Sequence, residues 1–361
     1  MRKKRILIVF GGRSAEHEVS ICSARSIIQE LDRNKYRVFP LAITKKGKWL
    51  SFYQSAKLLL SPGQKLEELE VEVEGGGRQI GEVIGERLLK ENKIEIVFPV
   101  LHGPYGEDGT FQGMLEMFDI TYVGSGVLAS ALGMSKIEQK KIFAYEKLPI
   151  LPWQELREKE WEESQEKILK EVKKKFTFPL FVKPSNLGSS IGITKAHNEK
   201  ELIRGIRLAF LYDTRILIEK GIEAREIECS VLGGEEPCAS LPGEILPSRE
   251  FYDYEAKYLN GKSRLIVPAQ LPEKLRETIQ KTSCAAFRAI DCFGMARVDF
   301  LLEKKTNRLY LNEINTIPGF TKISMYPKLW EVSGLSYQKL LDKLIDLAEE
   351  RHWRRKEQKV K

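Results

Sequence analysis

Two acidic residues, Asp299 and Glu313, lie in apolar segments on either side of a polar break at 304–307. This pattern predicts a β-hairpin in which Asp299 faces Glu313 and Arg297 faces Asn315. Opposed residues have Cβ atoms about 4.5–5.5 Å apart, and two negative charges at about 5 Å repel by roughly 3 kcal/mol at an effective dielectric of about 20. Such a pair either retains a proton or binds a cation. With the amide oxygen of Asn315, the set favours a hard cation such as Mg²⁺.

Strict alternation along the second strand of this hairpin gives Glu313 and Asn315 the same face as Leu309 and Leu311. The alternative is an edge hairpin whose charges face water, as most surface charges do. The acids have apolar neighbours, Val298 among them, and this favours the metal site.

The composition is that of a globular protein, with 42% hydrophobic and 30% charged residues. At 361 residues the chain is long enough for two or three domains. The net charge of +8 comes from the two ends, MRKKR and residues 351–361, and the rest is nearly neutral. Charge that is confined to the termini is typical of exposed ends that keep a protein soluble, and we expect no nucleic-acid partner.

The sequence also predicts a reducing compartment. The five cysteines are odd in number and lack CxxC spacing, which is typical of buried thiols. The apolar run after MRKKR is too short for a secretory signal, and no run reaches transmembrane length. We therefore expect a cytoplasmic protein without a membrane partner.

Elements that could position the hairpin occur along the whole chain. The segment 5–10 is predicted to be a buried strand followed by a helix to about Leu31, and 94–101 to be a second strand. Such an arrangement indicates an open α/β domain, which binds ligands at the carboxyl ends of its strands. We expect 45–92 to be an elaboration of this domain.

The remaining elements are helices at 133–147, 153–175 and about 336–350, and strands at 178–185, 216–222 and 226–234. Between two strands lies the loop 184–192, PSNLGSSIG, with Lys183 at its base. Its small residues would let backbone N–H groups approach an anion, although such loops are more often structural. Lysines, a flexible loop and metal-binding carboxylates together are what phosphoryl transfer from ATP requires.

At this point a resemblance becomes specific. The segments GGRSAEHEVS (11–20), HGPYGEDGTFQGMLE (102–116), FVKPSNLGSSIG (181–192), LIEKGI (217–222), FYDYEAKY (251–258), ARVDF (296–300) and NEINTIPGFT (312–321) closely resemble the D-alanine–D-alanine ligases, ATP-grasp enzymes of bacterial cell-wall synthesis, in the family's order. The resemblance covers about residues 5–350. It implies an α/β fold: an N-terminal open α/β domain, known as the pre-ATP-grasp domain, followed by a two-lobed ATP-grasp fold.

The implied division is 1–123 for the N-terminal substrate domain, 124–219 for the central lobe, 220–350 for the C-terminal lobe, and 351–361 for a basic tail. The resemblance further implies two D-alanine substrates, ATP as cosubstrate, two Mg²⁺ ions that Mn²⁺ can replace, and a homodimer.

Site residues also follow from the resemblance. It assigns both metal ions to Asp299, Glu313 and Asn315, with Glu313 bridging them. The positions that match nucleotide contacts are Lys136, Lys183, Glu219, Lys220, Ile222, Glu226 and Lys257.

Catalytic and substrate positions complete the set. Arg297 and the backbone of Gly319 match the groups that stabilise the oxyanion of the tetrahedral intermediate. The first substrate's ammonium group is assigned to Glu16, and His102 matches a position near that substrate. Without the resemblance, His102 would be interpreted as a structural histidine at a strand end, with its hydrogen bonds made within the fold. The second substrate is assigned to Ser324 and Met325.

A hydrogen-bonded triad is implied for Glu16, Ser189 and Tyr258, and a movable cover for 251–263. Taken alone, Tyr258 would read as a half-buried aromatic residue. Two alternatives remain: a ligase for D-alanyl-D-lactate or D-alanyl-D-serine, and an ATP-grasp binding protein without turnover. Lactate-accepting forms typically place a histidine near FYDYEAKY, and this chain has none between 198 and 351. We therefore predict a dipeptide product.

Overall fold

A parallel sheet forms the N-terminal part of the chain. The structure, a computed structural model, describes residues 2–73, 92–246 and 264–357. The sheet has the order β2-β1-β3-β4, and all its strands run in parallel. Its strands are β1 Lys4–Gly11, β2 Tyr36–Ile43, β3 Ile96–Val100 and β4 Thr121–Tyr122. The predicted strands at 5–10 and 94–101 are confirmed. Their continuous apolar runs reflect a sheet that is covered on both faces.

Helices cover this sheet. The predicted helix after the first strand is confirmed as α1 His17–Glu30. The 45–92 segment contributes α2 Phe52–Leu59, which begins at a capping box of Ser51 and Gln54, and a short 3₁₀ helix Leu66–Leu69. The next helix, α4 Thr110–Met117, precedes β4.

The predicted single helix 133–147 is wrong in one respect, because the chain forms two helices there. These are α5 Val127–Met134 and α6 Lys136–Tyr145. Between them Ser135 is extended, and its hydroxyl accepts a hydrogen bond from the Glu138 N–H at 3.3 Å. A serine in this position is a good N-cap, which explains why α6 starts anew at Lys136.

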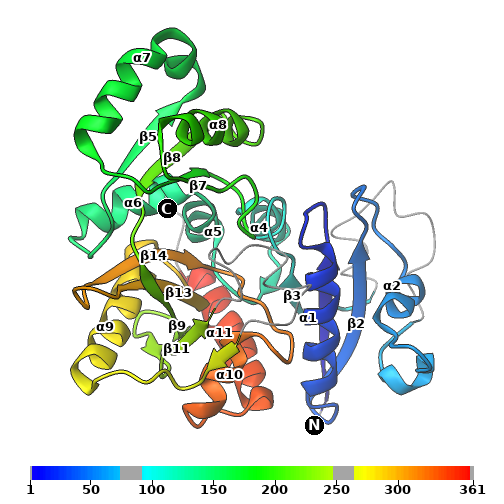
Figure 1. Cartoon of the computed structure of the whole chain (residues 1–361). Coiled ribbons are helices and arrows are strands. Elements are labelled where there is room, and N and C mark those ends of the chain that lie inside the picture. Colours follow the sequence, from blue (N-terminus) through cyan, green and yellow to red (C-terminus); the bar gives the residue numbers. More distant parts are fainter. Residues whose placement is uncertain (1, 74–91, 247–263, 358–361) are drawn as a thin grey trace.

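The central lobe is an antiparallel sheet of order β5-β8-β6-β7 with two helices, at the top of Figure 1. Its elements are β5 Trp153–Arg157, α7 Glu158–Lys175, β6 Leu180–Pro184, β7 Thr194–Ala196, α8 Glu199–Phe210 and β8 Arg215–Lys220. The predicted helix 153–175 is wrong for its first five residues. They form β5, because pairing with β8 satisfies their backbone groups.

The C-terminal lobe contains the predicted hairpin in a sheet of order β12-β11-β9-β13-β14, with β10 beside β9. The strands are β9 Ala224–Gly233, β10 Cys238–Ala239, β11 Gly243–Leu246, β12 Arg264–Ile266, β13 Gly294–Glu303 and β14 Leu309–Asn315. The helices are α9 Glu273–Ala289 and α10 Met325–Val332. One apolar core lies between α9 and the sheet, and α5 and α6 contribute Ala129 and Phe143 to it.

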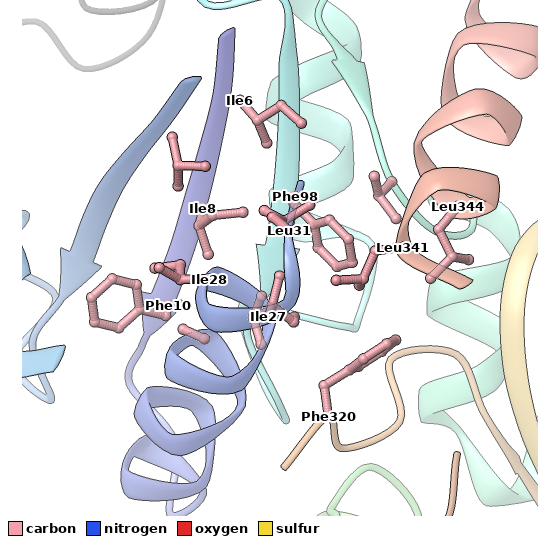
Figure 2. Close-up of a cluster of buried hydrophobic side chains, with 14 of the residues drawn as sticks. Ile6, Ile8, Phe10, Ile27, Ile28, Leu31, Phe98, Phe320, Leu341 and Leu344 are labelled. Carbon is pink, nitrogen blue, oxygen red and sulfur yellow. The ribbon is translucent and has the colours of Figure 1, made fainter. Parts of the chain in front are cut away.

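The last helix, α11 Tyr337–Glu357, is longer than the predicted 336–350. Its Leu341 and Leu344 lie in the same apolar core as Ile6 and Phe98 of the parallel sheet, and Phe320 packs beside Phe98 (Figure 2). The described residues 351–357 belong to this helix. They are therefore helical, and the solubilising role expected for this charged end stays a prediction.

None of the helices in the described part of the chain combines the length and hydrophobicity that crossing a bilayer requires.

Candidate active site

The hairpin has the predicted register at its open end. Asp299 of β13 lies opposite Glu313 of β14, and Arg297 lies opposite Asn315. Because β9 pairs with the other edge of β13, Asp299 lies on an inner strand, whereas Glu313 lies on β14, the last strand of the described sheet.

A β-bulge changes the faces of β14. The register shifts beside the Asp299–Glu313 pair, and Asn312 is the extra residue. Leu311 and Ile314 are buried, whereas Asn312 and Glu313 line the same cavity. The expected alternation, with Leu311 on the face of Glu313, is therefore wrong. The bulge turns two consecutive polar side chains towards the cleft.

The Asp299 carboxylate is held by charged and polar neighbours. Arg297 donates from Nε and Nη2 to its two oxygens, both at 2.7 Å. The Asn315 amide nitrogen donates to Oδ2 at 3.0 Å, so the amide oxygen of Asn315 points elsewhere. Arg297 Nε also lies 3.2 Å from Oε2 of Glu228, a buried acid on β9. The guanidinium is thus fixed between two carboxylates.

Glu313 is approached by Lys136, the first residue of α6. The distance from Lys136 Nζ to Glu313 Oε2 is 3.7 Å. The same ammonium donates to the Leu187 carbonyl oxygen at 2.5 Å, which ties α6 to the loop after β6. Lys136 therefore joins the hairpin to the central lobe.

A small polar cavity of about 80 Å³ lies above the hairpin. Its described lining comes from the start of α1, the segment after β3, the start of α6, the loop after β6 and the hairpin. The predicted residues among them are Glu16, His102, Lys136, Ser189, Arg297, Glu313, Asn315 and Gly319. Segments about 300 residues apart in the sequence thus meet at one site.

The loop after β6 closes against the N-terminal domain. The Ser189 hydroxyl donates a hydrogen bond to the Glu16 carboxylate. At Gly188 a Cβ atom would lie 2.9 Å from Oε2 of Glu16, so a larger residue would crowd this contact. Ser189 and Ser190 both have positive φ angles, 51° and 60°, in the left-handed region that costs energy for residues other than glycine. Two of the three triad members are therefore in contact.

His102 and Glu107 lie on the turn that follows β3. His102 Nδ1 lies 3.1 Å from the Ile317 carbonyl oxygen, and its Nε2 is buried without a hydrogen-bond partner among the described residues. Burial lowers the pKa of the His102 imidazole, which therefore stays neutral. Burial first, and the Glu16 charge second, raise the pKa of Glu107 to about 8. The cavity thus contains a neutral histidine and a carboxyl group that resists ionisation.

A larger cleft of about 620 Å³ adjoins the small cavity, a size typical of sites for drug-sized ligands. Its described lining includes every predicted nucleotide position outside the 247–263 segment, together with two of the predicted metal ligands. These residues are Lys136, Lys183, Glu219, Lys220, Ile222, Glu226, Asp299 and Glu313.

An ion-pair cluster underlies this cleft. The Glu219 carboxylate is only 1% exposed and lies between two ammonium groups, Lys140 Nζ at 2.5 Å and Lys183 Nζ at 2.6 Å. Burial alone would raise the pKa of Glu219, but the charges of Lys140 and then Lys183 outweigh it and lower the pKa to about 2. Lys183 also lies 3.4 Å from the bulge residue Asn312.

Two predicted residues differ in their surroundings. The Ser324 hydroxyl bonds to Thr321 and would lie 2.9 Å from a Cβ atom at Gly319, so it lies beside the small cavity. Met325 is buried in a separate apolar cluster with Ile245, and it is not among the described residues that line the cavity. Lys257, Tyr258 and the predicted cover 251–263 lie outside the described residues.

Four residues of the site were missed by the sequence reasoning. Glu228 lies two residues after Glu226 on the same strand, so the period of two could have placed both in the cleft. Glu107 belongs to a quoted motif, HGPYGEDG, but carried no assignment. No local sequence pattern predicts the bulge at Asn312 or the burial of Lys140.

The parallel α/β domain, the two antiparallel lobes and the lysine-rich cleft between them define the ATP-grasp class of ligases. The sequence model described as "D-ala D-ala ligase N-terminus" matches residues 5–125, and that described as "D-ala D-ala ligase C-terminus" matches residues 142–346. The chain belongs to the D-alanine–D-alanine ligase family.

Curated relatives and solved structures agree with this assignment. D-alanine–D-alanine ligases of Chloroherpeton thalassium and Thermoanaerobacter sp. are 49% and 52% identical, each alignment covering at least 98% of both chains. The D-alanine–D-alanine ligase of Coxiella burnetii has a TM-score of 0.84 at 37% identity, covering 99% of this chain and 97% of its own. The VanG D-Ala:D-Ser ligase of Enterococcus faecalis scores 0.78 at 32% identity, covering 96% and 100%.

Proposed function

We propose that this protein joins two D-alanine molecules to D-alanyl-D-alanine for peptidoglycan precursor synthesis, converting ATP to ADP and phosphate. Family membership supports the two substrates. The observation that carries the proposal is the wall shared by the small cavity and the large cleft. Lys136, Ser190, Ile193 and Glu313 line both of them. A carboxylate in the small cavity would therefore lie next to a phosphate in the cleft.

The chemistry follows from this juxtaposition. A carboxylate is a poor electrophile, so the γ-phosphate of ATP first converts the first D-alanine to an acyl phosphate. The amine of the second D-alanine then attacks the carbonyl carbon, and phosphate leaves. Catalysis of this kind rests on positioning and on charge stabilisation.

Residues of the small cavity would hold the amino acids. Glu16 pairs with the first ammonium group, and the buried Nε2 of His102 contacts the same substrate. Arg297, fixed between Asp299 and Glu228, and the backbone N–H of Gly319 stabilise the oxyanion.

The triad of Glu16, Ser189 and Tyr258 closes the site, and the Ser189–Glu16 hydrogen bond supports its first half. We assign the second substrate to Ser324 and Met325. The burial of Met325 implies that it acts through the apolar support of the segment 321–325. A cover at 251–263 would exclude water, because acyl phosphates hydrolyse readily.

Residues of the cleft would hold the nucleotide. Lys136, Lys183, Lys220 and Lys257 neutralise phosphates, Ile222 packs on the purine, and Glu226 accepts hydrogen bonds from ribose hydroxyls. The carboxylate of Glu219 is buried between two lysines, so its side chain acts through Lys183.

Two Mg²⁺ ions, which Mn²⁺ can replace, would be held by Asp299, Glu313 and Asn315. No cluster of three or more His, Cys, Asp or Glu residues suited to a metal occurs in the described ranges. The two carboxylates nevertheless fit Mg²⁺, which typically takes one or two carboxylates and completes its shell with substrate phosphates and water. The amide group of Asn315 would have to turn to offer its oxygen, because its nitrogen now faces Asp299. When bound, the ions would neutralise the charge that develops on the transferred phosphate.

We further propose the division into 1–123, 124–219, 220–350 and 351–361, and a homodimer, on the strength of the family. The cysteines in the described residues are free thiols, which fits a cytoplasmic enzyme that uses ATP.

Measuring phosphate release tests the function. Purified protein with ATP, Mg²⁺ and D-alanine should release phosphate and form the dipeptide. Adding D-lactate or D-serine at neutral pH should leave the dipeptide as the main product. Predominant ester or D-alanyl-D-serine would favour the alternative ligases, of which the VanG enzyme is a structural relative. Folded, Mg²⁺-loaded protein without turnover would favour a binding protein.

Substituting Glu313 tests the mechanism. Glu313→Gln should lower kcat on the order of 1000-fold while the far-ultraviolet circular dichroism spectrum stays unchanged. Glu303→Gln, at the other end of β13, is the matched control and should keep its activity. An active Glu313→Gln enzyme would contradict the metal assignment.

A further inference from the structure

Lys140 is a buried lysine behind the nucleotide cleft. Its side chain is only 2% exposed, and it is not among the described residues that line the cleft. Its ammonium lies 2.5 Å from Glu219 Oε1 and 3.4 Å from the Leu311 carbonyl oxygen. A buried lysine costs desolvation energy, so it persists only where a partner compensates for that cost.

The partner of Lys140 is shared with a residue that does face the cleft. Glu219 accepts from Lys183 through its other oxygen at 2.6 Å, and Lys183 lines the cleft. Two ammonium groups and one carboxylate leave a net charge of +1. Without Lys140, Lys183 and Glu219 would form a neutral pair. Because Lys140 is buried behind them, the surplus charge lies on the side that faces the cleft.

We propose that Lys140 is a positioning residue that balances Glu219, so that Lys183 presents a full positive charge to the phosphates of the nucleotide. This inference rests on the proposed function, since it takes ATP as the ligand of the cleft. It assigns the affinity for the nucleotide in part to a residue that the nucleotide does not touch.

The test is a set of four proteins: wild type, Lys140→Met, Glu219→Gln and the double variant. Binding of Mg·ADP is measured by titration calorimetry, and KM for ATP and D-alanine together with kcat by phosphate release. Lys140→Met should weaken Mg·ADP binding and raise KM for ATP, each by about tenfold to 100-fold, as expected for the loss of one net charge. KM for D-alanine and kcat at saturating ATP should change less than threefold.

The double variant separates charge balance from a merely structural role. It restores a net charge of +1 around Lys183, so it should bind Mg·ADP more tightly than Lys140→Met does. When Glu219→Gln is already present, the buried Lys140 lacks the carboxylate that keeps it protonated, so it is already neutral and its further change should alter affinity less than threefold. A double variant as weak as, or weaker than, Lys140→Met would overturn the proposal.

Lys141→Met is the matched control, because Lys141 is the next residue of α6 and is 44% exposed in ion pairs with Glu138 and Glu155. It should bind Mg·ADP like the wild type. If Lys140→Met does not fold, the comparison of Glu219→Gln with the double variant decides: a difference above threefold overturns the proposal. Wild-type protein that binds no Mg·ADP would refute the proposed function itself, whereas equal binding by wild type and Lys140→Met would refute this inference alone.

Discussion

In two clusters of ionised side chains, one around Glu219 and one around Asp119, two cations surround one carboxylate. Glu219 is 1% exposed between Lys140 and Lys183. The Asp119 side chain is 58% exposed, with Lys356 at 2.8 Å, Arg355 at 3.7 Å and the ring of His352 at 3.6 Å. The shortest contacts are similar, 2.5 Å in one cluster and 2.8 Å in the other, but the exposure of the two carboxylates to solvent differs greatly. Exposed pairs typically contribute less than about 1 kcal/mol, whereas removing one partner of a buried pair costs about 3–5 kcal/mol.

The largest effect is expected for Lys140→Met. It leaves the buried Glu219 carboxylate with one partner, so the free energy of unfolding should fall by about 3–5 kcal/mol. Urea unfolding followed by circular dichroism measures this loss. Part of it should return in the Lys140→Met/Glu219→Gln protein, because the uncompensated charge is gone. A loss below 1 kcal/mol would show that the buried cluster contributes no more to stability than the exposed one.

The second-largest effect is the contribution of Glu219 to the acid dependence of stability. Its pKa lies at about 2 in the folded protein, below its ordinary value of 4.5. A lowered carboxyl pKa gives stability that is present above pH 4.5 and is lost as the pH falls towards 2. The difference corresponds to about 3 kcal/mol. The stability gap between wild type and Glu219→Gln should therefore shrink across this window, as urea titrations at several pH values would show. A constant gap would contradict the assignment.

An intermediate loss of stability is expected for Arg351, which lies on α11 near the Asp119 cluster and is more buried than the residues of that cluster. Its guanidinium donates to the carbonyl oxygens of Gly124 at 2.7 Å and Tyr122 at 3.2 Å, and lies 3.9 Å from the centre of the Tyr122 ring. Arg351→Ala should lower the free energy of unfolding by about 2 kcal/mol. Arg351→Lys keeps the charge but loses the planar guanidinium that reaches both carbonyl oxygens, so it should recover less than half of that loss.

The smallest effect is expected in the exposed cluster around Asp119. Lys356→Ala removes the shortest contact to Asp119, yet it should change the free energy of unfolding by less than about 0.5 kcal/mol. Even this difference should vanish at about 1 M salt, where the Debye length is about 3 Å. A loss above 1 kcal/mol at high salt would show that exposure does not separate the clusters.

Much of the fold and of the hairpin was predictable because apolar periodicity is a local signal. The pairing of Asp299 with Glu313 followed from two apolar strands around a polar break. The strand at 153–157 was missed because the short polar segment WQELR runs directly into a highly charged helix, and only pairing with β8 makes it a strand. The bulge at Asn312 depends on the partner strand, and the burial of Lys140 depends on elements far along the chain. Neither is readable from neighbouring residues.

The packing of α11 has a consequence for how the protein is made. Leu340, Leu341, Leu344, Ile345 and Ala348 complete an apolar core whose other half is the parallel sheet of the first 100 residues (Figure 2). During synthesis, chains generally fold from the N-terminus as segments emerge from the ribosome. Here the face of the sheet that α1 covers in part stays incomplete until residues 337–348 have been translated. A premature stop before codon 337 would therefore harm the domain that was synthesised first.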